Sequence, residues 1–196
     1  PDPLNEQQIE QLLNHFRGQH YYEFILFLAR VGCRCGEAAA LEWNDFDLTK
    51  RKVTISRSMS HLGTISDTKT GQDRTIDLTP MVVAALNKLK LRSQKNANFV
   101  FQTPSGTPVR MSNFRELVWY PALKKLGLPP VRIHDLRHSC ASFLITRTKD
   151  LYYASKQLGH SSISITCDRY GHLLEDDGPT RLIDLLDEPA LTAQDR

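Results

Sequence analysis

Residues 53–78 read VTISRSMSHLGTISDTKTGQDRTIDL, and this stretch decides the fold class of the chain. Apolar and polar side chains alternate in three short runs, at 53–55, 64–68 and 76–78. A period of two is typical of half-buried β-strands. The turn between the last two runs contains Lys69-Thr70-Gly71. We therefore expect a small antiparallel sheet in which these two runs form a hairpin with Lys69 at its tip.

Helical periodicity surrounds this sheet on both sides. Asn5 is a good N-cap for a first helix, with Gln8 at the capping-box position. Residues 21–31 are apolar on most faces and predict a buried helix, and a third helix is expected from near Cys35 through Trp43. Further helices are expected from Pro80 and at 111–126, 134–147, 150–157 and 162–170, with a short amphipathic piece at 179–186. The expected architecture is α+β, a mostly helical single domain with a small antiparallel sheet.

Length and composition indicate an ordinary globular protein. A chain of 196 residues is long enough to bury a core and favours one domain over two. Its longest apolar run, residues 24–31, is interrupted by Arg30 and is too short to cross a membrane. No charged-then-apolar leader opens the chain, so we expect a cytoplasmic protein without a membrane partner. Pro1-Asp2-Pro3 runs straight into the first helix, which favours a fragment boundary over a natural terminus.

The cysteines do not predict a metal site. Cys33 and Cys35 are separated by one residue, which is the wrong spacing for a Cys-x-x-Cys metal knuckle, and no second pair follows. Cys140 and Cys167 lie in predicted helices. We expect four reduced, half-buried thiols and no bound metal.

The formal net charge of +3 conceals an uneven distribution of charge. Residues 173–196 carry seven acidic side chains and two arginines. Of the totals of 25 basic and 22 acidic side chains, the other 172 residues therefore keep 23 and 15. A basic body with an acidic tail favours a polyanion as the partner of the body.

Arg34 is the first residue that suggests chemistry. It stands in Gly32-Cys33-Arg34-Cys35-Gly36-Glu37, a glycine-flanked turn between two predicted helices. A guanidinium group matches two phosphate oxygens and stays charged at any working pH. Taken alone, this stretch favours a structural ion pair between Arg34 and Glu37 at the start of a helix.

A second group of functional side chains is His134-Asp135-Leu136-Arg137-His138. In a helix, His134, Arg137 and His138 lie on one face. Two imidazoles and a guanidinium are costly to bury together unless an anion fills the space between them. Apolar residues at 141–145 indicate that this helix belongs to the core, which argues against a solvated polar face. His138 is also compatible with a structural role.

A third group of residues lies near the end of the chain. Leu158-Gly159-His160 predicts a helix that ends in glycine, with a histidine in the turn, and Ser162 caps a helix that runs to Tyr170. Most tyrosines at helix ends are packing residues, so Tyr170 gains its meaning from the groups before it. Two arginines, a lysine, two histidines and a tyrosine are the parts needed to cut a phosphodiester without a metal ion.

In this order of groups, the chain resembles the catalytic domain of the tyrosine recombinases, also called the phage integrase family. The resemblance runs from about Asn5 to about Leu174. The resembling segments are 32–45, 68–71 with 74–78, 134–138, 158–162 and 170–172. Five segments in register make the resemblance specific.

The resemblance implies roles for the charged groups. Arg34 and Arg137 would clamp the scissile phosphate, and His160 would donate a further hydrogen bond to it. Lys69 would protonate the leaving 5′ oxygen as a general acid, and His134 would assist proton transfer near the nucleophile.

The resemblance makes Tyr170 the nucleophile, which gives a 3′-phosphotyrosyl link and a free 5′-hydroxyl without ATP, metal or any other cofactor. Glu37 would orient Arg34, and His138 would have a supporting role. Helix face and charge separately suggest three contacts with the DNA backbone, each equally well explained as a solvated charge: Arg115, Lys124 and Arg132.

The resemblance also implies an organisation and partners. Residues 1–178 would be the catalytic domain and 179–196 an acidic amphipathic tail, with a helical core-binding domain missing ahead of them. Segment 179–186 would pack on a neighbouring copy or on its own domain. The implied partners are double-stranded DNA attachment sites, further copies in a tetrameric synapse and accessory DNA-bending proteins. The enzyme would be bacterial or phage-encoded and would act on the nucleoid.

Other interpretations of these residues stay open. A type IB topoisomerase uses a similar site to relax supercoils, and a catalytically inactive DNA-binding module would keep the same fold. A metal nuclease fits less well because no paired Asp/Glu cluster accompanies the histidines. Integration, excision, inversion and dimer resolution are all compatible with the residues, and the spacing in 166–170 favours a phage or genomic-island integrase.

Overall fold

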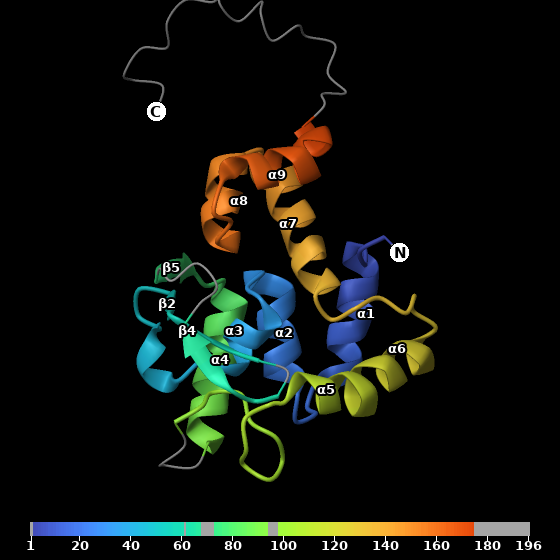
Figure 1. The fold of residues 1–196 in the computed structure, drawn as a ribbon. Helices are drawn as coiled ribbons and strands as arrows, with labels where there is room; N and C mark the ends of the chain where they lie inside the picture. Colours follow the sequence, from blue (N-terminus) through green and yellow to red (C-terminus); the bar gives the residue numbers. More distant parts are fainter. Residues whose placement is uncertain (1, 61, 68–72, 94–97, 175–196) are drawn as a thin grey trace, which may run out of the picture.

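The computed structural model describes residues 2–60, 62–67, 73–93 and 98–174 (Figure 1). The helices are α1 (Glu6–Phe16), α2 (Tyr22–Val31), α3 (Cys35–Ala39), α4 (Pro80–Arg92), α5 (Met111–Phe114), α6 (Tyr120–Leu126), α7 (Asp135–Thr148), α8 (Leu151–Leu158) and α9 (Ile163–Tyr170). Two short 3-10 helices, η1 (Trp43–Asp45) and η3 (Gly171–Leu174), and a π-helical segment, η2 (Arg115–Trp119), accompany them. The strands are β1 (Phe46–Asp47), β2 (Lys52–Ile55), β3 (Arg57–Met59), β4 (Ile65–Asp67) and β5 (Arg74–Asp77). The expected α+β class, mostly helical with antiparallel strands, is confirmed.

The first helix begins at the predicted cap. The side chain of Asn5 accepts a hydrogen bond from the backbone of Gln8 at 2.9 Å, and the side chain of Gln8 accepts one from the backbone of Asn5 at 3.0 Å. This reciprocal pair satisfies two backbone donors that a helix start would otherwise leave free. Helix α2 is buried along almost its whole length, as its apolar sequence predicts. Among the described residues, every helix is too short or too polar to cross a membrane.

The strands pair differently from the predicted hairpin. Strands β1, β2 and β5 form one antiparallel sheet, with Val53 opposite Ile76, whereas β3 and β4 form a separate two-stranded sheet. The expected pairing of 64–68 with 76–78 is therefore wrong. Burial explains the difference, because Val53 and Ile76 are both buried whereas β4 is exposed along its length. Lys69 lies outside the described residues.

The third helix is shorter than expected. It ends at Ala39, and Trp43 belongs to η1 instead. The chain between them leaves the helix because it pairs with residues 99–100: Val100 donates a backbone hydrogen bond to the carbonyl of Leu41 at 2.9 Å, and Phe99 forms an isolated β-bridge with Glu42. The predicted helix at 111–126 is observed as α5, η2 and α6 in direct succession.

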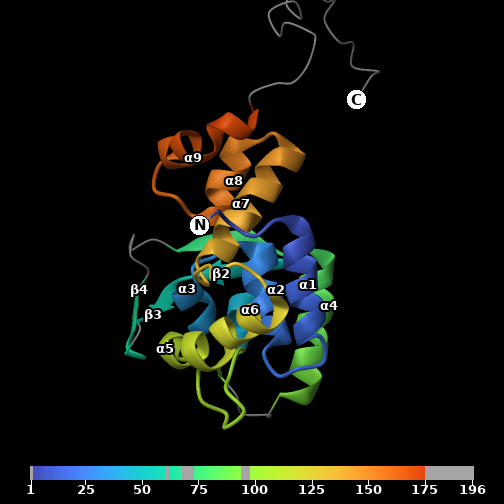
Figure 2. The same ribbon diagram turned by 90° about the vertical axis from the view of Figure 1, so that its right-hand side faces the viewer.

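The elements form a large body and a smaller helical layer that lies against it. Figures 1 and 2 both place α7, α8 and α9 together at one end of the molecule, with α1, α2 and the sheets below them. The main hydrophobic core is built around α1, α2 and α4, and a second cluster forms within the helical layer around Ala141, Ile145 and Leu158. Helix α7 packs on α2, and α8 packs on β5. The turns at the ends of α2 and α8 therefore meet where the two parts join.

Candidate active site

Arg34 stands in the turn between α2 and α3. Gly32 ends α2 in the left-handed conformation, with φ of 74°, and Arg34 is the N-cap of α3. The backbone N–H of Arg34 donates to Oε2 of Glu37 at 2.8 Å, and its Nη1 donates to Oε1 of the same carboxylate at 2.8 Å. The ion pair that the sequence allowed is thus present, and it holds the guanidinium of Arg34 at the start of the helix.

Glu37 also binds a second arginine. It is 1% exposed, and Arg74 in β5 donates to its two oxygens at 3.0 and 2.6 Å. Burial raises the pKa of the Glu37 carboxyl, but the hydrogen bonds and charges of Arg74 and Arg34 outweigh burial and lower its pKa overall. Glu37 is therefore a buried carboxylate that orients two guanidinium groups.

Arg137 connects the two parts of the molecule. It lies in the first turn of α7 and is 5% exposed. Its Nη1 donates to the backbone carbonyl of Gly32 at 2.9 Å and to that of Leu158 at 2.6 Å. Burial, followed by the positive charge of Arg34, lowers its pKa to about 10. Arg137 thus holds together the turn that leads to Arg34 and the turn that leads to His160.

His160 follows the glycine that ends α8. Gly159 adopts φ of 71°, and the Nδ1 atom of His160 lies 2.8 Å from Oγ1 of Thr166 in α9. Burial, followed by the charges of Arg137 and Arg34, lowers the pKa of His160 to about 4. The imidazole is therefore neutral at pH 7, and it lies within the positive field of both arginines.

Tyr170 is the last residue of α9, and its phenol points inward. It is 5% exposed and packs in the hydrophobic cluster of the helical layer. Its Oη lies 2.6 Å from Nδ1 of His138. Arg169 lies on the other side of the same ring, with Nη1 3.4 Å from Nε2 of His138. Burial raises the pKa of Tyr170, although the charges of Arg169 and Arg137 oppose this effect.

His134 and His138 have different places in the site. His134 is the N-cap of α7, and its ring packs edge-on against that of His138, with centroids 5.2 Å apart. Burial, followed by the charge of Arg137, lowers the pKa of His134 to about 4. Among the described side chains, His138 rather than His134 is hydrogen-bonded to Tyr170. The structure therefore places the residue expected to be supporting next to the phenol.

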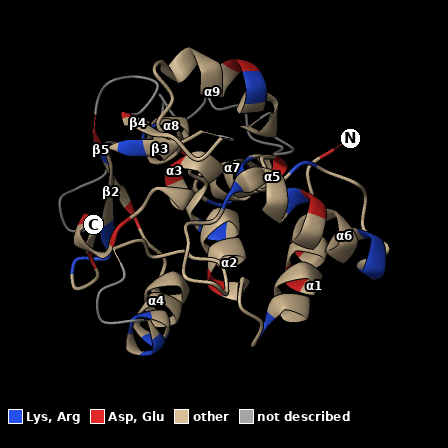
Figure 3. Cartoon of the chain, turned by 60° about the horizontal axis from the view of Figure 1, so that its bottom comes forward, with Lys and Arg blue, Asp and Glu red and all other residues tan. Residues whose placement is uncertain are grey.

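The three residues suggested as DNA-backbone contacts are all exposed on the surface. Arg115 forms an ion pair with Glu116 at 2.9 Å, and Arg132 forms one with Asp135 at 2.9 Å. Lys124 is exposed on α6. Figure 3 shows lysines and arginines on several elements, including α4 and α6, and not as a single patch.

The thiols are more varied than expected. Cys33 and Cys140 are buried, Cys35 is half-buried and Cys167 is exposed, and all four are free. Burial raises the pKa of the Cys33 thiol, and it raises that of Cys140 to about 11. Within the described residues, no three His, Cys, Asp or Glu side chains are grouped as metal ligands would be.

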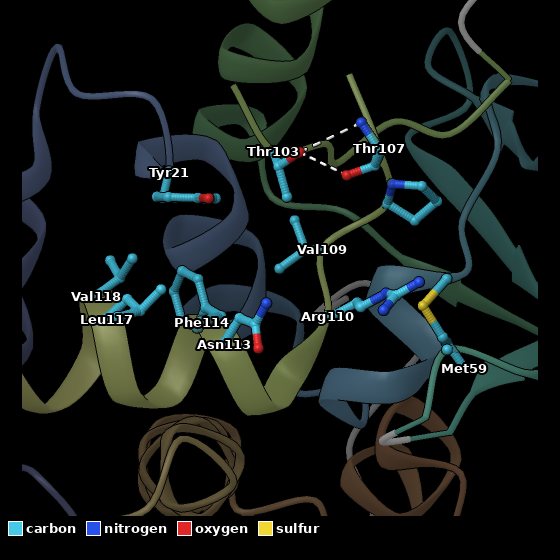
Figure 4. Close-up of a pocket in the computed structure, with 12 residues that line it drawn as sticks. Tyr21, Met59, Thr103, Thr107, Val109, Arg110, Asn113, Phe114, Leu117 and Val118 are labelled. Atoms are coloured by element: carbon cyan, nitrogen blue, oxygen red, sulfur yellow. Dashed lines mark hydrogen bonds between the residues drawn. The ribbon is translucent and has the colours of Figure 1, made fainter. Parts of the chain in front are cut away.

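A pocket of about 530 Å³ lies apart from these groups (Figure 4). It is lined by residues of α5 and η2 and of the preceding loop, among them Val109, Arg110 and Phe114. None of the described catalytic candidates lines this pocket. The candidate active site is instead the place where Arg34, Arg137 and His160 converge.

The chain belongs to the phage integrase family. The family model described as "Phage integrase family" matches residues 3–176. The chain is similar to the ICEBs1 integrase of Bacillus subtilis (strain 168), with 30% identity over 157 residues, 73% of this chain and 42% of that protein. It is also similar to a XerC-like tyrosine recombinase of Caldanaerobacter subterraneus subsp. tengcongensis, with 24% identity over 199 residues, 88% of this chain and 51% of that protein.

Solved structures show the same fold. The Tn1549 transposon integrase in complex with transposon right end DNA matches with a TM-score of 0.77 and 25% identity, over 87% of this chain and 61% of that chain. The XerA recombinase matches with a TM-score of 0.72 and 23% identity, over 97% of this chain and 67% of that chain. This chain spans about half the length of the curated relatives described above, at 42% and 51% of them.

Sequence reasoning missed three residues at the site: Arg74, Thr166 and Arg169. A signal for Arg74 was present, since it stands two residues before the buried Ile76 in a strand and so faces the same side of the sheet. Arg169 adjoins Tyr170, but the sequence does not reveal that it contacts His138. Thr166 has no sequence signal of its own, because threonine is common on helix faces.

Proposed function

We propose that this chain is the catalytic domain of a site-specific DNA recombinase that breaks and rejoins strands through a 3′-phosphotyrosyl intermediate. Family membership supports the class of reaction. The observation that carries the proposal is the position of Arg137, which ties the turn before Arg34 to the turn before His160. Two guanidinium groups and a neutral imidazole thereby converge on one space, and a phosphate is the anion that they fit.

In the proposed step, the Oη atom of Tyr170 attacks phosphorus and forms a phosphodiester to the enzyme. The bond between phosphorus and the 5′ oxygen breaks. The phenol proton passes to Nδ1 of His138, which touches the phenol, and His134, packed against that ring, assists the transfer. Lys69 gives a proton to the leaving oxygen, a role that rests on the family resemblance because Lys69 is not described.

Arg34 and Arg137 stabilise the charge that develops on the phosphate oxygens, and His160 adds a hydrogen bond to one of them. Glu37 acts by orienting Arg34. In the second half of the reaction, the hydroxyl of another strand attacks the phosphotyrosyl link and releases Tyr170, so no external energy source is needed.

The organisation and partners of the whole protein follow from this proposal. Residues 1–178 form the catalytic domain and 179–196 the tail, and the substrate is double-stranded DNA bearing an attachment site. Copies of the chain assemble as a tetrameric synapse, with accessory DNA-bending proteins at some sites and with the bacterial nucleoid as the place of action.

Three basic residues contribute to binding of the DNA backbone, which predicts a DNA affinity that falls steeply with salt: Arg115, Lys124 and Arg132. Segment 179–186, which lies outside the described residues, is proposed to pack on a neighbouring copy, and unchanged assembly on DNA after deletion of 179–196 would contradict this.

Covalent trapping tests the proposal. The chain and its Tyr170→Phe variant are incubated in a chelating buffer with nicked duplexes that carry a randomised half-site, and products are separated on a denaturing gel. A protein–DNA band that only the wild type forms is the expected result. If neither the chain nor a longer version with its preceding residues forms this band, the inactive-module interpretation replaces the proposal. On a supercoiled plasmid that carries the same site, relaxed circles without strand-exchanged junctions would indicate a topoisomerase.

A further inference from the structure

We infer that Arg74 is a positioning residue of the active site, which holds Arg34 and the turn that carries His160 in a fixed relation. This inference rests on the proposed function. Arg74 comes from β5, a strand of the main body, and its side chain is 15% exposed. It lies between the first arginine turn and the turn at the end of α8, and it contacts both.

The first contact is with the carboxylate that orients Arg34. Oε1 of Glu37 accepts from Nη1 of Arg34 at 2.8 Å and from Nη1 of Arg74 at 3.0 Å. Oε2 accepts from the backbone of Arg34 at 2.8 Å and from Nη2 of Arg74 at 2.6 Å. Each oxygen of Glu37 is thus shared by the two arginines. Without Arg74, the carboxylate loses half of these hydrogen bonds and can rotate, and the guanidinium of Arg34 moves with it.

The second contact is with the residue before His160. A Cβ atom added to Gly159 would lie 2.1 Å from Nε of Arg74 and 2.5 Å from its Cδ. The side chain of Arg74 therefore packs directly on the backbone of Gly159. A shift of this side chain changes the support of the turn, and with it the place of the His160 ring.

The environment of Arg74 also argues for a positioning role. Its Nε is buried and has no hydrogen-bond partner among the described residues, and such a donor lowers stability. Both of its terminal nitrogens donate to Glu37, so its guanidinium is held on this carboxylate. Arg74 therefore acts through Arg34 and His160 and does not itself touch the reacting atoms.

Arg57 provides a matched control. Like Arg74, it is a strand residue that binds carboxylates: its Nη2 lies 2.6 Å from Asp45 and its Nη1 lies 3.2 Å from Glu42. Its side chain is 30% exposed. It lies in β3, outside the convergence of Arg34, Arg137 and His160. Arg57→Gln therefore removes a comparable ion-pair network and leaves the proposed site intact.

The test compares Arg74→Gln, Arg74→Lys and Arg57→Gln in single-turnover formation of the Tyr170 adduct, on the nicked duplexes selected by trapping. A misplacement of catalytic groups by about 1 Å lowers rates about 100-fold, so we expect Arg74→Gln to be slower by about 10- to 100-fold. Arg74→Lys keeps the charge and should fall between Arg74→Gln and wild type. Arg57→Gln should stay near the wild-type rate. Thermal melting of each variant corrects the rates for the folded fraction.

A second substrate distinguishes misplacement of Arg34 from partial unfolding of the variant. In a methylphosphonate at the scissile position, one charged oxygen is replaced by a methyl group, so correct placement of Arg34 matters less. The defect of Arg74→Gln relative to wild type should shrink on this substrate, whereas partial unfolding would lower both rates equally. A wild-type rate for Arg74→Gln, or an equal defect on both substrates, overturns the inference alone. Failure of the wild type to form any adduct dependent on Tyr170 overturns the proposed function, and the inference with it.

Discussion

The imidazole of His138 contacts the phenol of Tyr170, with 2.6 Å between Nδ1 and Oη. The contact links the face of α7 to the last residue of α9, 32 positions further along the chain. Burial, followed by the charge of Arg169, lowers the pKa of His138 from its ordinary value of 6.5. At pH 7 the ring is therefore neutral and able to accept a proton, while burial keeps the phenol protonated by raising its pKa. In the proposed reaction, His138 is therefore the group that takes the phenol proton.

Replacement of His138 should slow adduct formation and change its dependence on pH. In wild type, the rate should fall as the pH drops below 6.5 and through the lowered pKa of His138, because a protonated ring accepts no proton. We expect His138→Leu to lose about 100-fold in rate, the typical contribution of a general base, and to lose this acidic limb. Measurement of single-turnover rates between pH 5 and 8 checks both outcomes. His20→Gln, which removes a contact with the carbonyl of Gln102, is the control.

Acid should destabilise the protein through His134 and His160. Both have a pKa of about 4 in the folded chain, below the ordinary value of 6.5. The unfolded chain therefore binds more protons between these values, so the stabilising effect is complete above pH 6.5 and is lost towards pH 4. The melting temperature should fall on acidification through this window. The double variant His134→Gln, His160→Gln should show a shallower slope, and an unchanged slope would show that other groups are responsible.

Divalent oxyanions should stabilise the chain. Arg34 and Arg74 bind the single carboxylate Glu37, and the charge of Arg137 also acts on this group, so the site carries more positive than negative charge. Sulfate should raise the melting temperature more than sodium chloride at equal ionic strength, because a ligand that binds only the folded state stabilises that state. Most of this difference should disappear in Arg34→Gln. An equal response of Arg34→Gln and wild type would locate the sulfate effect elsewhere.

Gly159→Ala should damage the protein more than the same change at Gly127. Both glycines end helices in the left-handed region, with φ of 71° and 66°. That conformation alone lowers stability by about 1–2 kcal/mol for alanine. A Cβ atom at Gly127 meets nothing within 4 Å, whereas one at Gly159 would lie 2.1 Å from Nε of Arg74. Urea unfolding should therefore show the larger loss for Gly159→Ala, and only that variant should also slow cleavage. Equal losses would contradict the contact between Arg74 and Gly159.

The sequence predicted the helices well because their ends carry local signals. The cap at Asn5 and the glycine after Leu158 mark helix boundaries through side-chain and backbone chemistry that depends on a few neighbouring residues. The sheet was harder to predict because strand pairing depends on distant partners. Residues 64–68 and 74–77 lie close together in the sequence. Nevertheless β5 pairs with β2, because this pairing buries Ile76 against Val53.

Candidate site residues could be named from the sequence, but their contacts could not. Arg34, Arg137, His160 and Tyr170 stand out because their order along the chain matches a known family. The contact of His138 with Tyr170, in contrast, depends on how α7 and α9 pack, which no local pattern encodes. The predicted place of Lys69 stays a prediction because that residue lies outside the described part of the chain.

Several candidate catalytic groups stand at helix boundaries. Arg34 is the N-cap of α3, His160 follows the glycine that ends α8, and Tyr170 is the last residue of α9. Their positions in space therefore depend on where each helix starts or stops. An insertion of one residue inside α9 would rotate Tyr170 by about 100° around the helix axis and carry the phenol away from His138. Substitutions within these helices that preserve their buried faces leave that geometry unchanged. Over evolutionary time, helix length is thus expected to vary less than helix composition in this part of the protein.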